Sequence, residues 1–160
     1  MKQARNLFSG LILFMLVAIA TGCNDPNRVF DENTGIVNRN WSYTNPVKYH
    51  VKIDDEKADY KLYFNARVSG DYKYSNLFVL LHTRGPQMPP NLMRYELKLS
   101  SNTGEWLGSG SGNLYSYQIF FKTIRFPAKG VYNFEIEQNM RDNPLHEVSD
   151  IGLRVEKVTP

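Results

Sequence analysis

Histidine is the residue type in this chain best suited to bind a metal ion or to transfer protons. The sequence has three histidines, His50, His82 and His146, and they are far apart along the chain. A zinc site needs several His, Cys or carboxylate ligands that converge on one ion, and such ligands usually recur at short spacing. None of the three has a cysteine or another histidine nearby. We therefore predict neither a metal site nor a bound cofactor.

Two carboxylates have a spacing that suits acid–base chemistry. Glu135 and Glu137 lie two residues apart in a segment where apolar and polar residues alternate. Alternate side chains of a strand share one face, so these carboxylates would lie roughly 7 Å apart. That separation fits a glycoside hydrolase. Glutamates on the outer face of a strand more commonly contact only solvent, so we predict that the protein is not an enzyme and keep a hydrolase as a rival hypothesis.

Two loop segments carry residue types found in ligand-binding loops, but not their spacing. The acidic segment 54–59 lacks the alternating carboxylates of a calcium loop. The segment 104–112 is rich in glycine, but a strand is expected after it, whereas phosphate loops lead into the N-terminus of a helix. Both segments are predicted to be turns.

Aromatic residues make up 13% of the chain, and several fall in or near expected loops. Exposed aromatic rings in loops can stack on sugars or on a protein partner. The alternative is that they close the ends of the domain by packing against its core. The candidates for a recognition surface are Trp41, Tyr72, Tyr74, Trp106, Tyr115 and Tyr117.

The N-terminal segment has the parts of an export signal. Two basic residues precede an apolar run over residues 11–20, which is too short to span a bilayer as a helix. The sequence Ala20-Thr21-Gly22-Cys23 resembles the bacterial lipobox, in which the cysteine is acylated and becomes the first residue. Cys23 is the only cysteine in the chain, so it cannot form an internal disulfide. We predict lipid attachment at Cys23, with an ordinary secretory signal as the alternative.

The charge of the mature chain argues against binding to nucleic acid. Removal of residues 1–22 takes away two basic side chains and no acidic one, so the net charge falls from +3 to +1. Contacts to a phosphate backbone need a concentrated basic surface. No nucleic-acid partner is predicted.

Apolar and polar residues alternate in several runs, which predicts strands with one buried face. The runs cover residues 47–53, 60–68, 93–99, 132–137 and 151–156. Residues 77–81 are apolar without interruption, which predicts a strand buried on both faces. Turn residues separate the runs. We predict an all-β fold, an antiparallel β-sandwich of jelly-roll or immunoglobulin-like topology.

Three parts of the chain follow from these patterns. Residues 1–22 are predicted to be a lipoprotein signal peptide, and residues 23–40 to be the acylated N-terminus and a tether. The tether is expected because Asn, Asp, Pro, Gly and Thr favour turns and extended chain. Residues 41–160 are predicted to form the β-sandwich domain.

Distinctive blocks of sequence occur in a fixed order after Cys23. They are residues 27–30, 71–78, 104–110, 125–127, 130–138, 140–141 and 148–156. Together they resemble the gliding-motility lipoprotein GldH family of the Bacteroidota. The resemblance covers nearly the whole mature chain and implies a non-enzymatic lipoprotein of the cell envelope. Cys23 is the only functional residue that it carries over.

The resemblance implies a structural or assembly component of a cell-envelope machine. We expect anchoring in the outer membrane, facing the periplasm, through acyl chains on Cys23. The expected partners are that membrane and other envelope or gliding-machinery proteins. The alternative is a carbohydrate- or peptidoglycan-binding β-sandwich lipoprotein, which would contact glycans through its aromatic residues.

Overall fold

The chain forms strands where apolar and polar residues alternate. In the computed structural model, which describes residues 25–159, every second side chain of β3 (Val47–Ile53) is buried and those between are exposed. β9 (Gly130–Gln138) alternates in the same way and pairs antiparallel with β3. The other strands are β1 (Arg28–Gly35), β2 (Asn40–Trp41), β4 (Asp59–Ser69), β5 (Asn76–Gly85), β6 (Met88–Lys98), β7 (Ser109–Ser111), β8 (Leu114–Arg125), β10 (Leu145–His146) and β11 (Val148–Lys157), and a short 3₁₀ helix covers Val37–Arg39.

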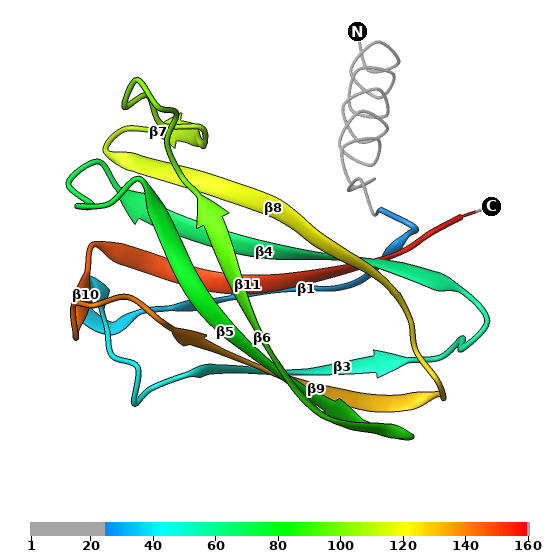
Figure 1. Cartoon of the computed structure of the whole chain (residues 1–160). Coiled ribbons are helices and arrows are strands. Elements are labelled where there is room, and N and C mark those ends of the chain that lie inside the picture. Colours follow the sequence, from blue (N-terminus) through cyan, green and yellow to red (C-terminus); the bar gives the residue numbers. More distant parts are fainter. Residues whose placement is uncertain (1–24, 160) are drawn as a thin grey trace, which may run out of the picture.

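Two antiparallel sheets pack face to face (Figure 1). The first sheet has the order β1-β11-β4-β8-β7 and the second has the order β3-β9-β5-β6, while β10 and β2 form a short third sheet. Apart from the short strands, the chain crosses between the two large sheets at most connections, and strands from its beginning and its end become neighbours. This interleaving is the jelly-roll arrangement. The predicted all-β sandwich is confirmed, and its topology is the jelly roll and not the immunoglobulin-like alternative.

Aromatic rings fill one end of the core between the sheets. Phe126 is fully buried, and its ring centroid lies 4.4 Å from that of Tyr132 and 5.3 Å from that of Tyr60. Such ring pairs add about 0.5–1.5 kcal/mol beyond the burial of their area. A hydrogen bond also joins the two sheets, because the hydroxyl of Tyr49 on β3 donates to the carbonyl of Ile151 on β11 at 2.6 Å.

The first strand begins within the segment that was predicted to be a tether. Residues 28–35 form β1 and pair with β11 along their length. β1 is mostly exposed, so no apolar alternation marks it in the sequence. Its contacts come from residues remote in sequence: Asp31 accepts hydrogen bonds from Arg154 at 2.6 Å and from the side chain of Asn65 at 2.9 Å. The prediction that the packed domain starts at residue 41 is therefore wrong for these residues.

The strand predicted to be buried on both faces is buried on only one. In β5, Leu77, Val79 and Leu81 face the core, whereas Phe78 and Leu80 are half-buried on the outer face of the second sheet. The guanidinium of Arg94 lies over the ring of Phe78, 3.8 Å from its centroid. A long side chain from the neighbouring strand thus shields this face in place of a further layer of structure.

The side of the sandwich between β6 and β8 is open. Met93 of β6, predicted to face the core, is 45% exposed. Pro89 and Pro90 stand near the start of β6. A register shift opposite Leu62 lets Lys122 of β8 line the cleft between the two strands. Prolines, a bulge and an exposed lysine at the cleft all discourage pairing with an additional strand.

Candidate functional site

Three of the six aromatic residues proposed for recognition are core residues. Trp41, Tyr72 and Tyr117 are buried. Their polar groups donate to backbone carbonyls inside the domain, at 3.1, 3.0 and 2.9 Å respectively. Burial raises the pKa of Tyr117 to about 12 and also raises the pKa of Tyr72. Because their rings are buried and their polar groups are hydrogen-bonded inside the domain, these three residues close the end of the sandwich and do not form the predicted recognition surface.

The other three aromatic residues are half-buried in two separate pairs. The rings of Trp106 and Tyr115 lie 5.3 Å apart, and the ring of Tyr74 packs edge-on against Tyr72 at 5.9 Å. Among residues 25–159 no ring contact joins the two pairs. Hydrogen bonds from Tyr74 and then from a neighbouring lysine lower the pKa of Asp142. The structure therefore brings the six aromatic residues to one end of the sandwich without combining them into one exposed face.

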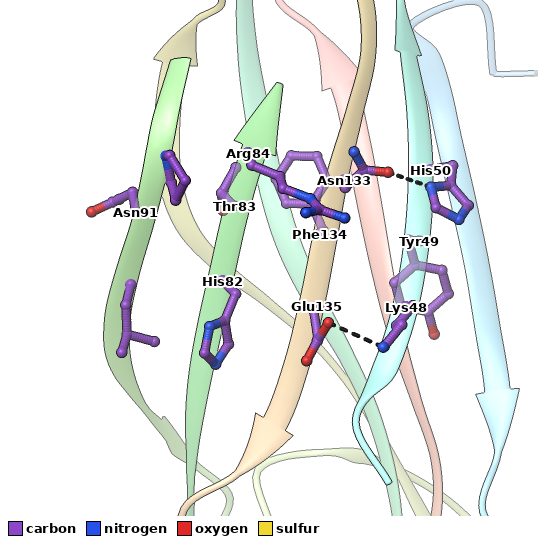
Figure 2. A pocket seen from close by; sticks show the side chains of 12 residues that line it. Lys48, Tyr49, His50, His82, Thr83, Arg84, Asn91, Asn133, Phe134 and Glu135 are labelled. Atoms are coloured by element: carbon purple, nitrogen blue, oxygen red, sulfur yellow. Dashed lines mark hydrogen bonds and ion pairs between the residues drawn. The ribbon is translucent and has the colours of Figure 1, made fainter. Parts of the chain in front are cut away.

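A hollow of about 390 Å³ lies on the outer face of the second sheet (Figure 2). Its polar side chains come from alternate positions of adjacent strands, which all point outward because the inward positions fill the core. We call this hollow the outer groove. The outward side chains that line it are Lys48 and His50 of β3, Asn133 and Glu135 of β9, and His82 and Arg84 of β5.

Cross-strand register sets the contacts in the outer groove. Lys48 is opposite Glu135, and its ammonium lies 3.4 Å from the carboxylate (Figure 2). His50 Nδ1 lies 2.5 Å from the side-chain oxygen of Asn133. Arg84 is exposed and makes no ion pair with any residue in the described part of the chain. The groove therefore presents one guanidinium available to a carboxylate or to another hydrogen-bond acceptor of a partner.

The two glutamates of the hydrolase hypothesis share a face, as predicted, but each faces a basic side chain. Glu135 pairs with Lys48, and the Glu137 carboxylate lies 3.6 Å from Nε2 of His82. Lys48 and Glu135 thus form an ion pair across the sheet surface, and Glu137 lies beside an imidazole. This arrangement gives no support to a carboxylate pair that acts on a glycosidic bond.

The structure brings two of the three histidines to the same groove. His50 and His82 both line it, while His146 lies at the far end of the sandwich, where its Nδ1 is 2.6 Å from the side-chain oxygen of Asn40. Across residues 25–159, no three His, Cys, Asp or Glu side chains are grouped closely enough to hold a metal ion. Sequence reasoning missed the outer groove because the register that places Arg84 beside these histidines depends on strands remote in sequence.

The predicted lipid-attachment residue, Cys23, lies outside the described residues. In the part of the chain that the structure does describe, no helix is long and apolar enough to cross a membrane.

Comparison with known proteins identifies the family. The sequence profile of the GldH lipoprotein family matches residues 28–155, from the first residue of β1 into β11. The chain belongs to the GldH lipoprotein family. It is 31% identical, over 96% of its length and 98% of the relative, to a protein of Christiangramia forsetii named gliding motility lipoprotein GldH homolog. It is 27% identical, over 93% of its length and 96% of the relative, to the gliding motility lipoprotein GldH of Flavobacterium johnsoniae.

The resemblance to GldH found in the sequence is thus confirmed. No solved structure matches the chain. The family is one of lipoproteins, which places the protein among those anchored in the cell envelope. The family match spans both large sheets, so the similarity to GldH relatives extends over the whole jelly roll.

Proposed function

We propose that this protein is a non-enzymatic component of a cell-envelope machine, held at the outer membrane by acyl chains on Cys23 and facing the periplasm. One observation carries the proposal: the family match begins at residue 28 and runs through the sandwich to residue 155. Cys23 stands just before that region, at the end of a sequence that resembles a lipobox. The two relatives named for gliding motility support a role in assembling or stabilising such a machine.

The way the protein uses its polar groups supports a binding role. In the outer groove, Glu135 and His50 are engaged by neighbouring strands, while Arg84 extends from the end of β5 without an ion-pair partner among the described residues. A rigid sheet that presents a few unpaired polar groups suits contact with another protein. The partner would be an envelope or gliding-machinery protein that places an acidic or carbonyl-rich segment in the groove.

Membrane fractionation tests the anchor. The Cys23→Ser variant should be recovered as a soluble or unprocessed species, whereas the unaltered chain should stay with membranes after salt and carbonate washes. A Thr44→Ser variant, changed in an exposed loop, serves as the control and should fractionate like the unaltered chain. Retention of Cys23→Ser in the washed membrane would overturn anchoring through this residue.

Site-specific photo-crosslinking in living cells tests the partner role. A photoreactive residue at Arg84, in the outer groove, should give adducts with specific envelope proteins, and one at Lys61, which is exposed on the first sheet, should not. The expected partners are proteins whose loss gives the same defect as loss of this protein. Strong binding to cell-wall sugars, lost in Trp106→Ala, together with no protein adduct at either position would favour the glycan-binding alternative.

A further inference from the structure

The chain immediately before β1 is fixed to the sandwich. The amide of Arg28 donates to the carbonyl of Asp25 at 3.1 Å, and the amide of Lys157 donates to the carbonyl of Asn27 at 2.8 Å. The carboxylate of Asp25 forms an ion pair with Arg154 of β11, whose side chain is only 14% exposed. Residues 25–27 therefore belong to the folded domain.

Little chain remains between this point and the predicted lipid. Cys23 precedes Asp25 by two residues, and an extended chain reaches at most about 3.3–3.6 Å per residue, or roughly 7 Å in all. A tether of 17 or so residues would let the domain move far from the bilayer and turn freely. A reach of about 7 Å holds the edge of the domain that contains Asp25 against the lipid headgroups.

The anchored edge is part of a continuous surface made of turns. Five segments meet at the end of the sandwich where β1 begins and β11 finishes (Figure 1). We call this surface the anchored end. Its segments are residues 25–27 with 157–159, residues 54–59, residues 126–130 and residues 85–88.

Specific contacts join these segments to one another. The amide of Val158 donates to the carbonyl of Asp59 at 2.8 Å, which joins the end of β11 to the start of β4. Tyr132 then links the remaining two turns, because its hydroxyl lies 2.8 Å from the carbonyl of Ala128 and 3.1 Å from that of Pro86. The anchored end is thus a rigid surface and not a set of independent loops.

The acidic segment 54–59 of the anchored end is neutralised by neighbouring basic side chains. Each carboxylate of the acidic segment 54–59 has a basic partner. The pairs are Lys52–Asp54 at 3.0 Å, Lys157–Asp55 at 2.7 Å, Lys129–Glu56 at 3.6 Å and Arg125–Asp59 at 3.0 Å. Lys57 is exposed and adds a further positive charge. Unpaired carboxylates would be repelled by anionic lipids, whereas this neutralised segment approaches them with less repulsion.

We propose that the anchored end lies flat on the lipid headgroups and that the opposite end of the jelly roll points away from the membrane. This inference rests on the proposed acylation of Cys23. It makes the acidic segment 54–59 and its basic partners a membrane-contact surface. It also directs the loops at the other end, which carry the exposed side chains of Val37, Tyr43 and Leu107, toward partners.

The two ends are separated by the length of the strands. β4 has 11 residues, and a strand rises about 3.3 Å per residue, so the far loops lie about 36 Å beyond the anchored end. An upright domain therefore gives two sets of surface positions at clearly different heights above the bilayer.

Depth measurements on the acylated protein in vesicles test the orientation. Cys23 is the only native cysteine and is consumed by the lipid, so an added cysteine can be labelled alone. Lys57→Cys and Pro127→Cys report the anchored end, and Thr44→Cys and Asn102→Cys report the far end. All four positions are exposed. Each variant is purified with its lipid, incorporated into phosphatidylethanolamine–phosphatidylglycerol vesicles and spin-labelled.

Labels at the anchored end should lie at the headgroup surface, and those at the far end should be about 36 Å farther out. Insertion of 15 Gly/Ser residues after Asn24 should remove this difference, because such a linker spans roughly 20 Å and lets the domain turn. Equal depths at both ends in the unaltered chain would overturn the orientation while leaving acylation intact. A protein that fails to float with the vesicles would overturn both the anchor and the orientation.

Discussion

Replacing Gly152 by alanine tests whether β1 is a fixed part of the sandwich. Gly152 lies on β11 opposite Asn33 of β1. A Cβ at this position would be 1.9 Å from the side-chain oxygen of Asn33 and 2.6 Å from the carbonyl oxygen of Glu32. The Asn33 side chain can rotate away, but the Glu32 carbonyl is backbone and can move only if β1 shifts. Overpacking of this kind costs about 1–3 kcal/mol, so we expect the free energy of unfolding to fall by that amount.

Gly35→Ala is the matched control on the same pair of strands. Gly35 lies on β1 opposite Asp150, and a Cβ there would meet nothing within 4 Å. Alanine loses less conformational entropy than glycine on folding, so this change should be neutral or stabilising by up to about 1 kcal/mol. The two variants add the same methyl group to the same ladder, and only one of them meets backbone.

Urea unfolding of the soluble Cys23→Ser chain measures the difference. For a domain of this size the free energy of unfolding falls by about 1–3 kcal/mol per molar urea, so a loss of about 2 kcal/mol in that free energy lowers the urea midpoint by roughly 1 M. Hydrogen exchange should also show faster exchange of β1 amides in Gly152→Ala than in Gly35→Ala. Equal midpoints and equal β1 protection in the two variants would refute the close approach of β1 to Gly152 and, with it, the short reach of the anchor.

Three further predictions concern the core and the outer face of the second sheet. Phe126→Ala should lower the free energy of unfolding by about 3–5 kcal/mol, because removal of a fully buried ring leaves a cavity. Phe126→Leu should cause a smaller loss. Thermal unfolding of both variants checks this. Burial raises the pKa of Tyr117 to about 12 in the folded protein, whereas a tyrosine in the unfolded chain ionises near pH 10. Ionisation of Tyr117 should therefore leave the free energy of unfolding unchanged below pH 10 and should lower it from pH 10 to 12. Tyr117→Phe should weaken this dependence in urea titrations at pH 9 and pH 11. Glu137→Gln should change stability by less than about 1 kcal/mol and should leave function in a complemented deletion strain unchanged, since Glu137 lies outside the outer groove in a partly exposed contact with His82. Loss of function in this variant with the fold intact would revive the hydrolase hypothesis.

Strands with a clear period were predictable from the sequence. The alternation in residues 47–53 and 132–137 fixes which face of β3 and of β9 is buried, because a strand alternates its side chains between two faces. The order of strands was not predictable, since jelly-roll and immunoglobulin-like sandwiches need the same alternation. The full length of β1 was not predictable for a different reason. Its polar residues are held by Arg154 and by backbone pairing with β11, and both contacts are remote in sequence.

The candidate sites were also only partly predictable, because their contacts join residues that are remote in sequence. The sequence shows that Trp41 and Tyr117 lie near turns. It does not show that the loops around them fold back over the ends of the core and bury both rings. His50 was recognisable as a residue on the polar face of its strand. Its proximity to Arg84 depends on the register of β9 between β3 and β5, which local sequence does not encode.

The features that discourage strand pairing on the open side, between β6 and β8, are especially important for a protein anchored in a membrane. Molecules restricted to two dimensions collide more often than the same number dispersed in a volume, and upright sandwiches would meet edge to edge. An unprotected β6 would pair with the β6 or β8 of a neighbour and grow into a continuous sheet. Pro89, Pro90 and the charge of Lys122 oppose that growth. The same residues that leave one side of this jelly roll open should therefore keep neighbouring copies from joining into a continuous sheet.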